Sequence, residues 1–169
     1  LKEYVQLNKL TNTRCHLVLG VSKYQVMQLD KPAVKDSELI SALQWSVKEH
    51  LNTEDELAID YFDSPASSSS VSKLNVVAVS KKEIVEIRNG ILMAGLQLET
   101  IGLEELAVCN LLPKKEDAVM MLKQQQGGQL SLNIIKQSKL YFSRRLKGYE
   151  NIGSLSPEEL SMGIADNLS

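Results

Sequence analysis

The chain has 169 residues, a mass of 18.8 kDa and a formal net charge of -2, which leaves room for one ordinary domain or two small ones. Hydrophobic residues make up 43% and charged residues 24%, so the apolar content is high enough to exclude a wholly disordered chain. The slightly acidic balance, with a pI of about 5.8, argues against a dedicated nucleic-acid-binding domain, because such domains are normally basic.

The two cysteines, Cys15 and Cys109, stand far apart and form no CxxC pair. They cannot build a disulfide framework, and we expect reduced core thiols in a cytosolic protein. No apolar run approaches the roughly 18–20 residues of a membrane span, and no signal peptide is visible. Because the chain begins with Leu1 rather than Met, we expect it to be a piece of a longer protein.

The first part of the chain begins with two short strand patterns and a helix pattern. Apolar runs at 15–20 and 24–29 are separated by a three-residue turn, which predicts the two strands of a hairpin. An apolar residue at every fourth position then predicts an amphipathic helix over about 37–51. This alternation is typical of an α/β fold.

Further strands and helices follow in the same alternating order. Residues 57–62 predict a strand with two distinct faces. One face carries Ala58, Asp60 and Phe62, and the other carries Leu57, Ile59 and Tyr61. A strand over 74–79 leads directly into a helix that begins at Lys81 and ends at Gly95. A strand over 96–101 and a short helix over 103–112 complete this part.

The pattern changes after a charged break at 113–117. Apolar runs at 118–122, 130–135 and 140–146 predict three strands. The joins between them are short, and short joins connect antiparallel neighbours. The sequence therefore predicts a three-stranded antiparallel meander.

A helix is predicted to follow the meander. Ser156, Pro157 and Glu159 stand at the N-cap, first and third helical positions, which is a favourable helix start. We expect two domains: an α/β unit over 14–112 and a second unit over 116–169. The second is small for an independent core and resembles the first part of a larger domain.

No residue stands out as catalytic or metal-binding. Neither His16 nor His50 has a cysteine or carboxylate at ligand spacing, so no metal site is predicted. The chain contains no GxxxxGK[ST], GxGxxG or GxSxG motif. Asp60 belongs to an acidic stretch with Asp63 and 54–56, but a metal-dependent nuclease needs carboxylates from several strands. A capping or pairing role is therefore favoured for Asp60.

Four segments carry a resemblance to a known family: VVAVSKKEIV at 76–85, GLQLETI at 95–101, EELA at 104–107, and the two strands within 130–144. Their order and content resemble the PilM family of type IV pilus assembly proteins, over about residues 14–150. The resemblance implies an actin-like, ribonuclease-H-like α/β fold. In such a fold, an inserted α/β subdomain is followed by the three-stranded antiparallel meander and a helix.

The chain departs from actin-like ATPases at the turn between the first two meander strands. There, such ATPases carry a carboxylate that organises Mg²⁺ and a glycine that lets backbone amides approach phosphate. The corresponding segment 123–129 keeps Gly127 and Gly128 but has no carboxylate. We interpret the two glycines as a plain hairpin turn or as a vestigial nucleotide-binding site. No enzymatic activity and no cofactor are predicted, and ATP binding is left open for the intact parent.

The resemblance also implies a function. Members of the family work at the cytoplasmic face of the inner membrane and bind the cytoplasmic peptide of a PilN-like assembly protein; an assembly ATPase is a further implied partner. Asp60, Tyr61 and Phe62 would then form one wall of the peptide groove, and the alternative is a core strand with one polar edge residue. Two other hypotheses are an ATP-binding actin-like protein with nucleotide-dependent assembly, and an unrelated α/β interaction module.

Overall fold

The computed structural model describes residues 1–65, 72–113, 116–124, 130–146, 149 and 152–168. These residues form two compact units, unit 1 (Leu1–Val108) and unit 2 (Cys109–Ser169). The boundary falls within α4, a short helix over Glu104–Cys109. No helix in the described ranges is both long enough and apolar enough to cross a membrane.

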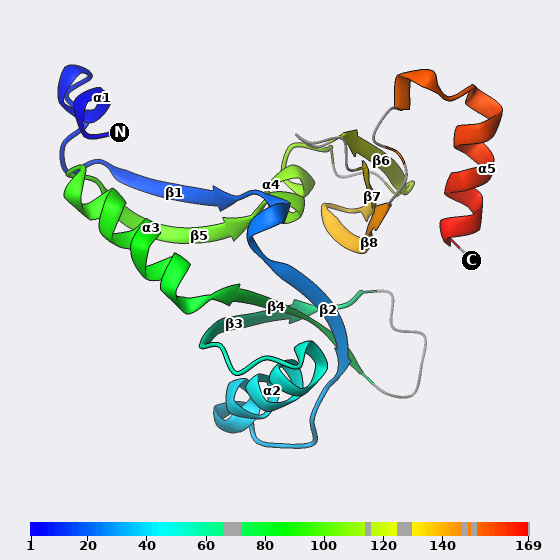
Figure 1. Ribbon diagram of the computed structural model, residues 1–169, viewed down its shortest axis with the longest axis horizontal. Coiled ribbons are helices and arrows are strands. Elements are labelled where there is room, and N and C mark those ends of the chain that lie inside the picture. Colours follow the sequence, from blue (N-terminus) through cyan, green and yellow to red (C-terminus); the bar gives the residue numbers. More distant parts are fainter. Residues whose placement is uncertain (66–71, 114–115, 125–129, 147–148, 150–151, 169) are drawn as a thin grey trace. The chain divides into compact units, whose positions relative to one another are not determined.

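Unit 1 begins with α1 (Lys2–Leu7) and contains a two-stranded parallel sheet. Strand β1 (Arg14–Leu19) pairs with β5 (Gln97–Leu103), and the register shifts at a bulge between Cys15 and His16. Parallel neighbours require a long crossover connection. Here the crossover is a complete α/β insertion (Figure 1).

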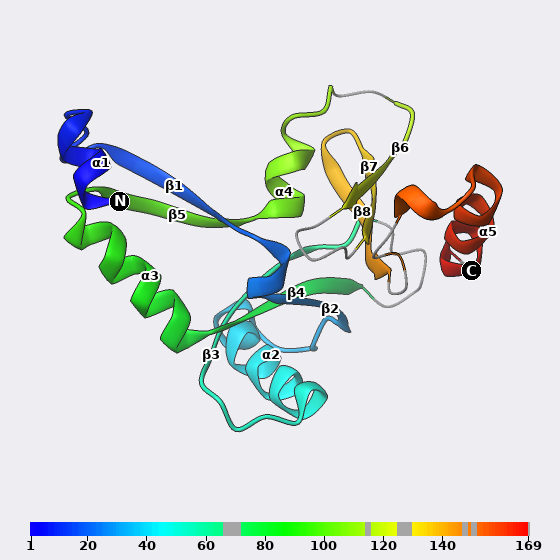
Figure 2. The same cartoon turned by 45° about the horizontal axis from the view of Figure 1, so that its top comes forward.

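The insertion is built on a second, antiparallel sheet. Its strands are β2 (Gln25–Asp30), β3 (Leu57–Asp63) and β4 (Lys73–Ser80), in the order β2-β4-β3. Helix α2 (Asp36–Leu51) covers the face that points away from β1 and β5, as Figures 1 and 2 both show. Helix α3 (Lys81–Met93) then leads the chain from β4 back to β5.

The predicted hairpin of residues 15–20 and 24–29 is wrong. Strands β1 and β2 belong to different sheets, and the 3-10 turn Val21–Lys23 carries the chain from one sheet to the other. Val21 and Tyr24 are buried, and both belong to the core between the sheets. A short join permits a hairpin but does not require one. Here the apolar residues Val21 and Tyr24 are buried between the two sheets, and the chain passes from one sheet to the other.

The two faces of the antiparallel sheet pack into separate cores, because side chains alternate along a strand. On one face, α2 packs against Leu74, Val76 and Ala78 of β4. On the other face, Val77 and Val79 pack against residues of β1, β5 and the intervening turn. The alternation that the sequence predicts for 57–62 is confirmed, since Tyr61 packs on the α2 side and Phe62 on the other.

The predicted helices of unit 1 are confirmed, with adjusted ends. Helix α2 runs over Asp36–Leu51, and Asn52 ends it in the left-handed conformation. After α3, Gly95 takes a φ of 88°, a value that a glycine adopts without strain. The last helix is shorter than the predicted 103–112, since α4 covers only Glu104–Cys109.

Unit 2 contains the predicted antiparallel meander. Its strands are β6 (Val119–Gln124), β7 (Leu130–Lys136) and β8 (Lys139–Leu146), in sequence order. Gln137 and Ser138 join the last two strands, and both have positive φ. Positive φ at both central residues is what a type I′ hairpin turn requires.

The C-terminal helix of unit 2 starts as its sequence predicts. After the 3-10 turn Ile152–Ser154, α5 spans Pro157–Leu168. The hydroxyl of Ser156 accepts a hydrogen bond from the Glu159 N–H at 3.2 Å, and a Glu159 carboxylate oxygen accepts one from the Ser156 N–H at 2.8 Å. These bonds complete a capping box, and they hold the pKa of Glu159 below its usual value.

Candidate functional site: a groove beside β3

An apolar groove of about 280 Å³ opens between the two sheets of unit 1. One wall is the β3 segment 58–62 together with Val77 and Val79 of β4. The opposite wall consists of the β5 segment 101–103 with Leu19 of β1, and Ile84 and Leu106 complete the lining. The groove thus has apolar walls from both sheets, the usual make-up of a site that accepts apolar side chains.

The structure brings the predicted residues Asp60, Tyr61 and Phe62 to this groove, and all three line it. Asp60 lies opposite Val77 in the register of β3 and β4, so its side chain is on the groove face of the sheet. Phe62 also packs on that side. Tyr61 instead packs its ring on the α2 side, so it presents its main chain to the groove. A role in binding a partner stays a prediction for these residues.

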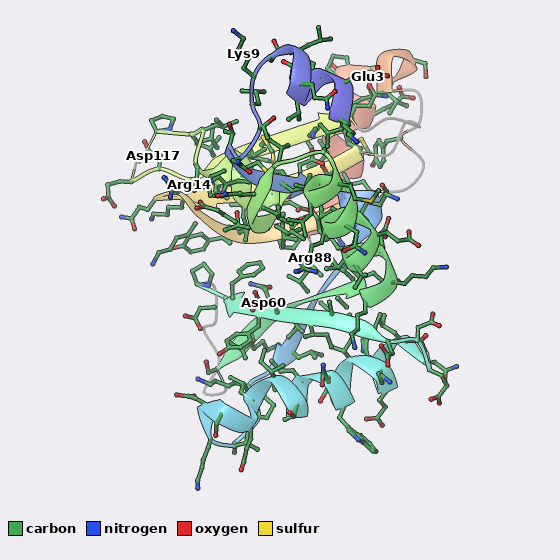
Figure 3. All side chains as sticks on the ribbon, turned by 90° about the vertical axis from the view of Figure 1, so that its left-hand side faces the viewer. Glu3, Lys9, Arg14, Asp60, Arg88 and Asp117 are labelled. Atoms are coloured by element: carbon green, nitrogen blue, oxygen red, sulfur yellow. The ribbon has the colours of Figure 1, made fainter. Side chains whose placement is uncertain are left out.

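Asp60 also occupies the free edge of β3. Among the described residues, strand β3 is at the edge of its sheet and pairs with β4 on one side only. The Tyr61 N–H donates a hydrogen bond to a carboxylate oxygen of Asp60 at 2.8 Å. A carboxylate at this position satisfies an edge donor and carries an exposed negative charge, as edge strands often do to avoid unwanted pairing. Figure 3 shows Asp60 at its place on β3.

Two polar contacts connect the elements that surround the groove. The Tyr24 hydroxyl donates to a carboxylate oxygen of Glu105, and both side chains are buried. The Lys23 ammonium lies 2.6 Å from a carboxylate oxygen of Glu83 on α3. This hydrogen bond, and then the charge of Glu83, raise the pKa of Lys23 above its usual 10.5. Both contacts connect the turn between the sheets to a helix that lines the groove.

Sequence reasoning identified only the β3 side of the groove. The opposite wall, from Leu19 and residues 101–103, and the Tyr24–Glu105 pair were missed. The partners in that pair are 81 residues apart, and no motif or spacing connects them. The one available signal was the buried-strand pattern of 15–20, which indicated a core position but not its neighbours.

Gly127 and Gly128, the predicted nucleotide-binding residues, lie outside the described residues. Among the described residues, no group of three or more His, Cys, Asp or Glu side chains could hold a metal ion. His16 lies on the surface, 2.7 Å from the Thr100 hydroxyl and 3.4 Å from a carboxylate oxygen of Glu99. His50 lies in the last turn of α2, where a histidine suits the helix dipole.

Comparisons with known proteins identify the fold. No protein-family description matches the sequence, and no curated protein does. A solved structure described as the PilM-PilN type IV pilus biogenesis complex matches with a TM-score of 0.67 and 14% identity, over 98% of this chain and 54% of that chain. The chain has a PilM-like fold.

A second solved structure extends the similarity. It is the cytoplasmic domain of EpsL, an inner membrane component of the type II secretion system of Vibrio cholerae. It matches with a TM-score of 0.59 and 13% identity, over 86% of this chain and 56% of that chain. The chain therefore spans about half the length of each similar structure. The predicted fold class is confirmed: a mixed, actin-like α/β fold with a three-stranded antiparallel sheet and a C-terminal helix.

Proposed function

We propose that this chain belongs to an assembly component of a type IV pilus or of a related secretion machine. Its role there is to bind the cytoplasmic segment of an inner-membrane partner in the groove beside β3. The observation that carries the proposal is an apolar groove in a unit whose fold resembles PilM. Because the similar structure is a PilM-PilN complex, the proposed partner is a PilN-like protein.

Within this class we propose a divergent, MshI-like protein of mannose-sensitive haemagglutinin pilus biogenesis, at the cytoplasmic face of the inner membrane. The support is the sequence resemblance of segments 76–85, 95–101 and 130–144 to the PilM family. A second candidate is the cytoplasmic domain of a secretion-system membrane component, and the EpsL similarity favours it. The partner's identity distinguishes the two candidates.

The groove defines what the partner segment must present. Its walls are almost entirely apolar, so an aliphatic or aromatic side chain is the natural occupant, and full burial of one such side chain contributes about 1.5–3 kcal/mol. Apart from the Tyr61 N–H, which Asp60 already satisfies, the main chain at the free edge of β3 can pair with an extended segment. Asp60 on the groove face favours a cationic residue next to the apolar one.

We propose that the role is not enzymatic. The segment 123–129 has no carboxylate to organise a metal ion, so hydrolysis would fall to a separate assembly ATPase as a further partner. The alternative is a nucleotide-binding actin-like protein. Calorimetry of the intact parent with Mg²⁺ and ATP separates them: the proposal expects no binding by folded protein, and tight binding would favour the alternative.

The groove is tested with fluorescently labelled peptides from the cytoplasmic segments of PilN-like proteins. Fluorescence polarisation should show saturable binding, and Asp60→Arg should weaken it at least about tenfold, because the new side chain crosses the groove and reverses its charge. The matched control is Ser41→Arg on the exposed side of α2, which should bind as the unmodified chain does. Equal affinity of the two variants would show that the groove is not the binding site. Absence of binding by every such segment would contradict the proposed function.

A further inference from the structure

A second surface of unit 1 exposes the only tryptophan of the chain. Trp45 lies on α2 with 78% of its surface exposed, although the same helix buries Leu39, Leu43 and Val47 on its other side. An indole in water contributes nothing to the core, and tryptophan is among the residues most enriched at the centres of binding sites. The position of Trp45 therefore indicates a contact surface.

Trp45 borders a depression of about 350 Å³ where α2 ends. The lining is Trp45, Lys48, Glu49, Asn52, Thr53 and Glu54. Asn52 adopts a left-handed conformation, with φ of 47°, and turns the chain back beside the helix. The Thr53 N–H donates to the Lys48 carbonyl at 3.3 Å, and the Thr53 hydroxyl accepts from the Asp55 N–H at 3.2 Å. These local hydrogen bonds hold the shape of the depression.

The rim of the depression is acidic. Glu49 and Glu54 are exposed, and neither has an ion-pair partner within the part of the chain that the structure describes. Glu56, in contrast, pairs with Lys81 at 3.0 Å. The pKa of Glu56 is lowered mainly by that hydrogen bond and charge, with a smaller contribution from Lys48. Lys48 also lines the depression, so two carboxylates stand against one ammonium group and the net charge of the lining is negative.

We propose that this depression binds an arginine side chain from an extended segment of a partner protein. A guanidinium can stack on the indole face of Trp45 while it donates hydrogen bonds to Glu49 or Glu54, a combination that suits arginine better than lysine. The depression accommodates one side chain, whereas a stable interface between folded domains needs about 800 Å² from each partner. A second copy of this chain would oppose two acidic rims, which repel each other.

This surface is separate from the groove beside β3. Helix α2 covers one face of the antiparallel sheet, and the groove lies on the other face. The proposal therefore does not depend on the proposed function, and each can fail without the other. It adds a second contact point by which a basic segment can reach unit 1.

The sole tryptophan makes the test direct, because its fluorescence reports only this site. The full chain is titrated at low salt with capped Gly-Gly-X-Gly-Gly peptides in which X is arginine, lysine or citrulline, the neutral analogue of arginine. We expect a saturable change with arginine, about twofold to fivefold weaker binding with lysine, and none with citrulline. An equal response to arginine and citrulline would overturn the proposal.

Matched variants locate the binding charge. The double variant Glu49→Gln/Glu54→Gln keeps Trp45 and should lose the response to the arginine peptide. Glu38→Gln makes the same change in the first turn of α2, outside the depression, and should respond as the unmodified chain does. Arginine binding that persists in the double variant would overturn the proposal. Both sets of changes are on exposed side chains, and circular dichroism verifies that the helix is retained.

Discussion

The two faces of the β2-β4-β3 sheet differ in how completely they are covered. On the closed face, Leu39, Leu43 and Val47 of α2 are 0–1% exposed and pack against fully buried residues of β4. On the open face, Val77 and Val79 are each 7% exposed and line a groove. One strand supplies both faces because its side chains alternate. The closed face stabilises the unit, and the open face leaves apolar surface available for a partner.

The largest expected effect is on the closed face. Leu43→Ala should lower the free energy of unfolding of unit 1 by about 2–5 kcal/mol, because it leaves a cavity under a completely buried side chain. Urea unfolding followed by circular dichroism measures the loss. A sharper comparison uses neighbours on β4: Val76→Ala on the closed face should cost more than Val77→Ala on the open one. Equal costs would mean that the two faces are equally well packed.

The next effect concerns the buried Tyr24–Glu105 hydrogen bond beside the groove. Tyr24→Phe removes the hydroxyl that donates to the buried Glu105 carboxyl group and should cost about 1–3 kcal/mol, the usual loss when a buried acceptor is left without its hydrogen-bond donor. Tyr4→Phe, on an exposed ring of α1, is the matched control and should be neutral in the same unfolding measurement. Equal free energies of unfolding for the two variants would show that the Tyr24–Glu105 bond does not stabilise unit 1.

A stabilising change is expected in α3, the helix that joins the two sheets. Gly90 lies inside α3, and no atom lies within 4 Å of the place where a Cβ would stand. Gly90→Ala should therefore raise stability by about 0.5–1 kcal/mol through helix propensity alone. Gly163→Ala in α5 is the contrasting case, because its Cβ would collide with the Tyr149 hydroxyl. Thermal unfolding should show a gain for the first variant and no gain for the second.

On the open face, a change in charge should affect binding more than stability. Asp60→Asn keeps an oxygen acceptor for the Tyr61 N–H, so stability should change by less than about 0.5 kcal/mol. Affinity for a cationic partner peptide should fall about twofold to fivefold with the loss of one exposed charge. Unfolding and fluorescence polarisation on the same sample test both parts. A large loss of stability would show that Asp60 stabilises the edge of the sheet, and would contradict a role in partner binding alone.

The smallest effect is a pH dependence at the start of β3. The Lys81 hydrogen bond and charge lower the pKa of Glu56 below 4.5. A carboxyl whose pKa is lowered by folding contributes stability above its ordinary pKa, and that contribution is lost as the pH falls through the lowered value. Glu56→Gln should therefore lower stability slightly at pH 7 and make no difference at a pH well below the lowered pKa, so the acid limb of stability becomes flatter. An unchanged acid limb would show that the pair contributes nothing.

Local patterns predicted most of the elements. The four-residue repeat of α2, the Ser156–Glu159 capping box and the short joins of the meander each depend on residues close together in the chain. The two-faced pattern of 57–62 also placed Asp60 and Phe62 on one side of the sheet, which became the groove side. These features are readable because a helix, a cap and a tight turn satisfy their hydrogen bonds within a few residues.

The sequence by itself therefore determined the helices, the meander and the two-faced pattern of β3. Only the tertiary structure decided that β1 pairs with β5 instead of β2, and that Leu19, residues 101–103 and the Tyr24–Glu105 pair complete the groove. The physical reason is that a strand edge presents the same row of donors and acceptors to any partner. The choice among partners is made by which apolar faces bury each other best, and those faces come from distant parts of the chain.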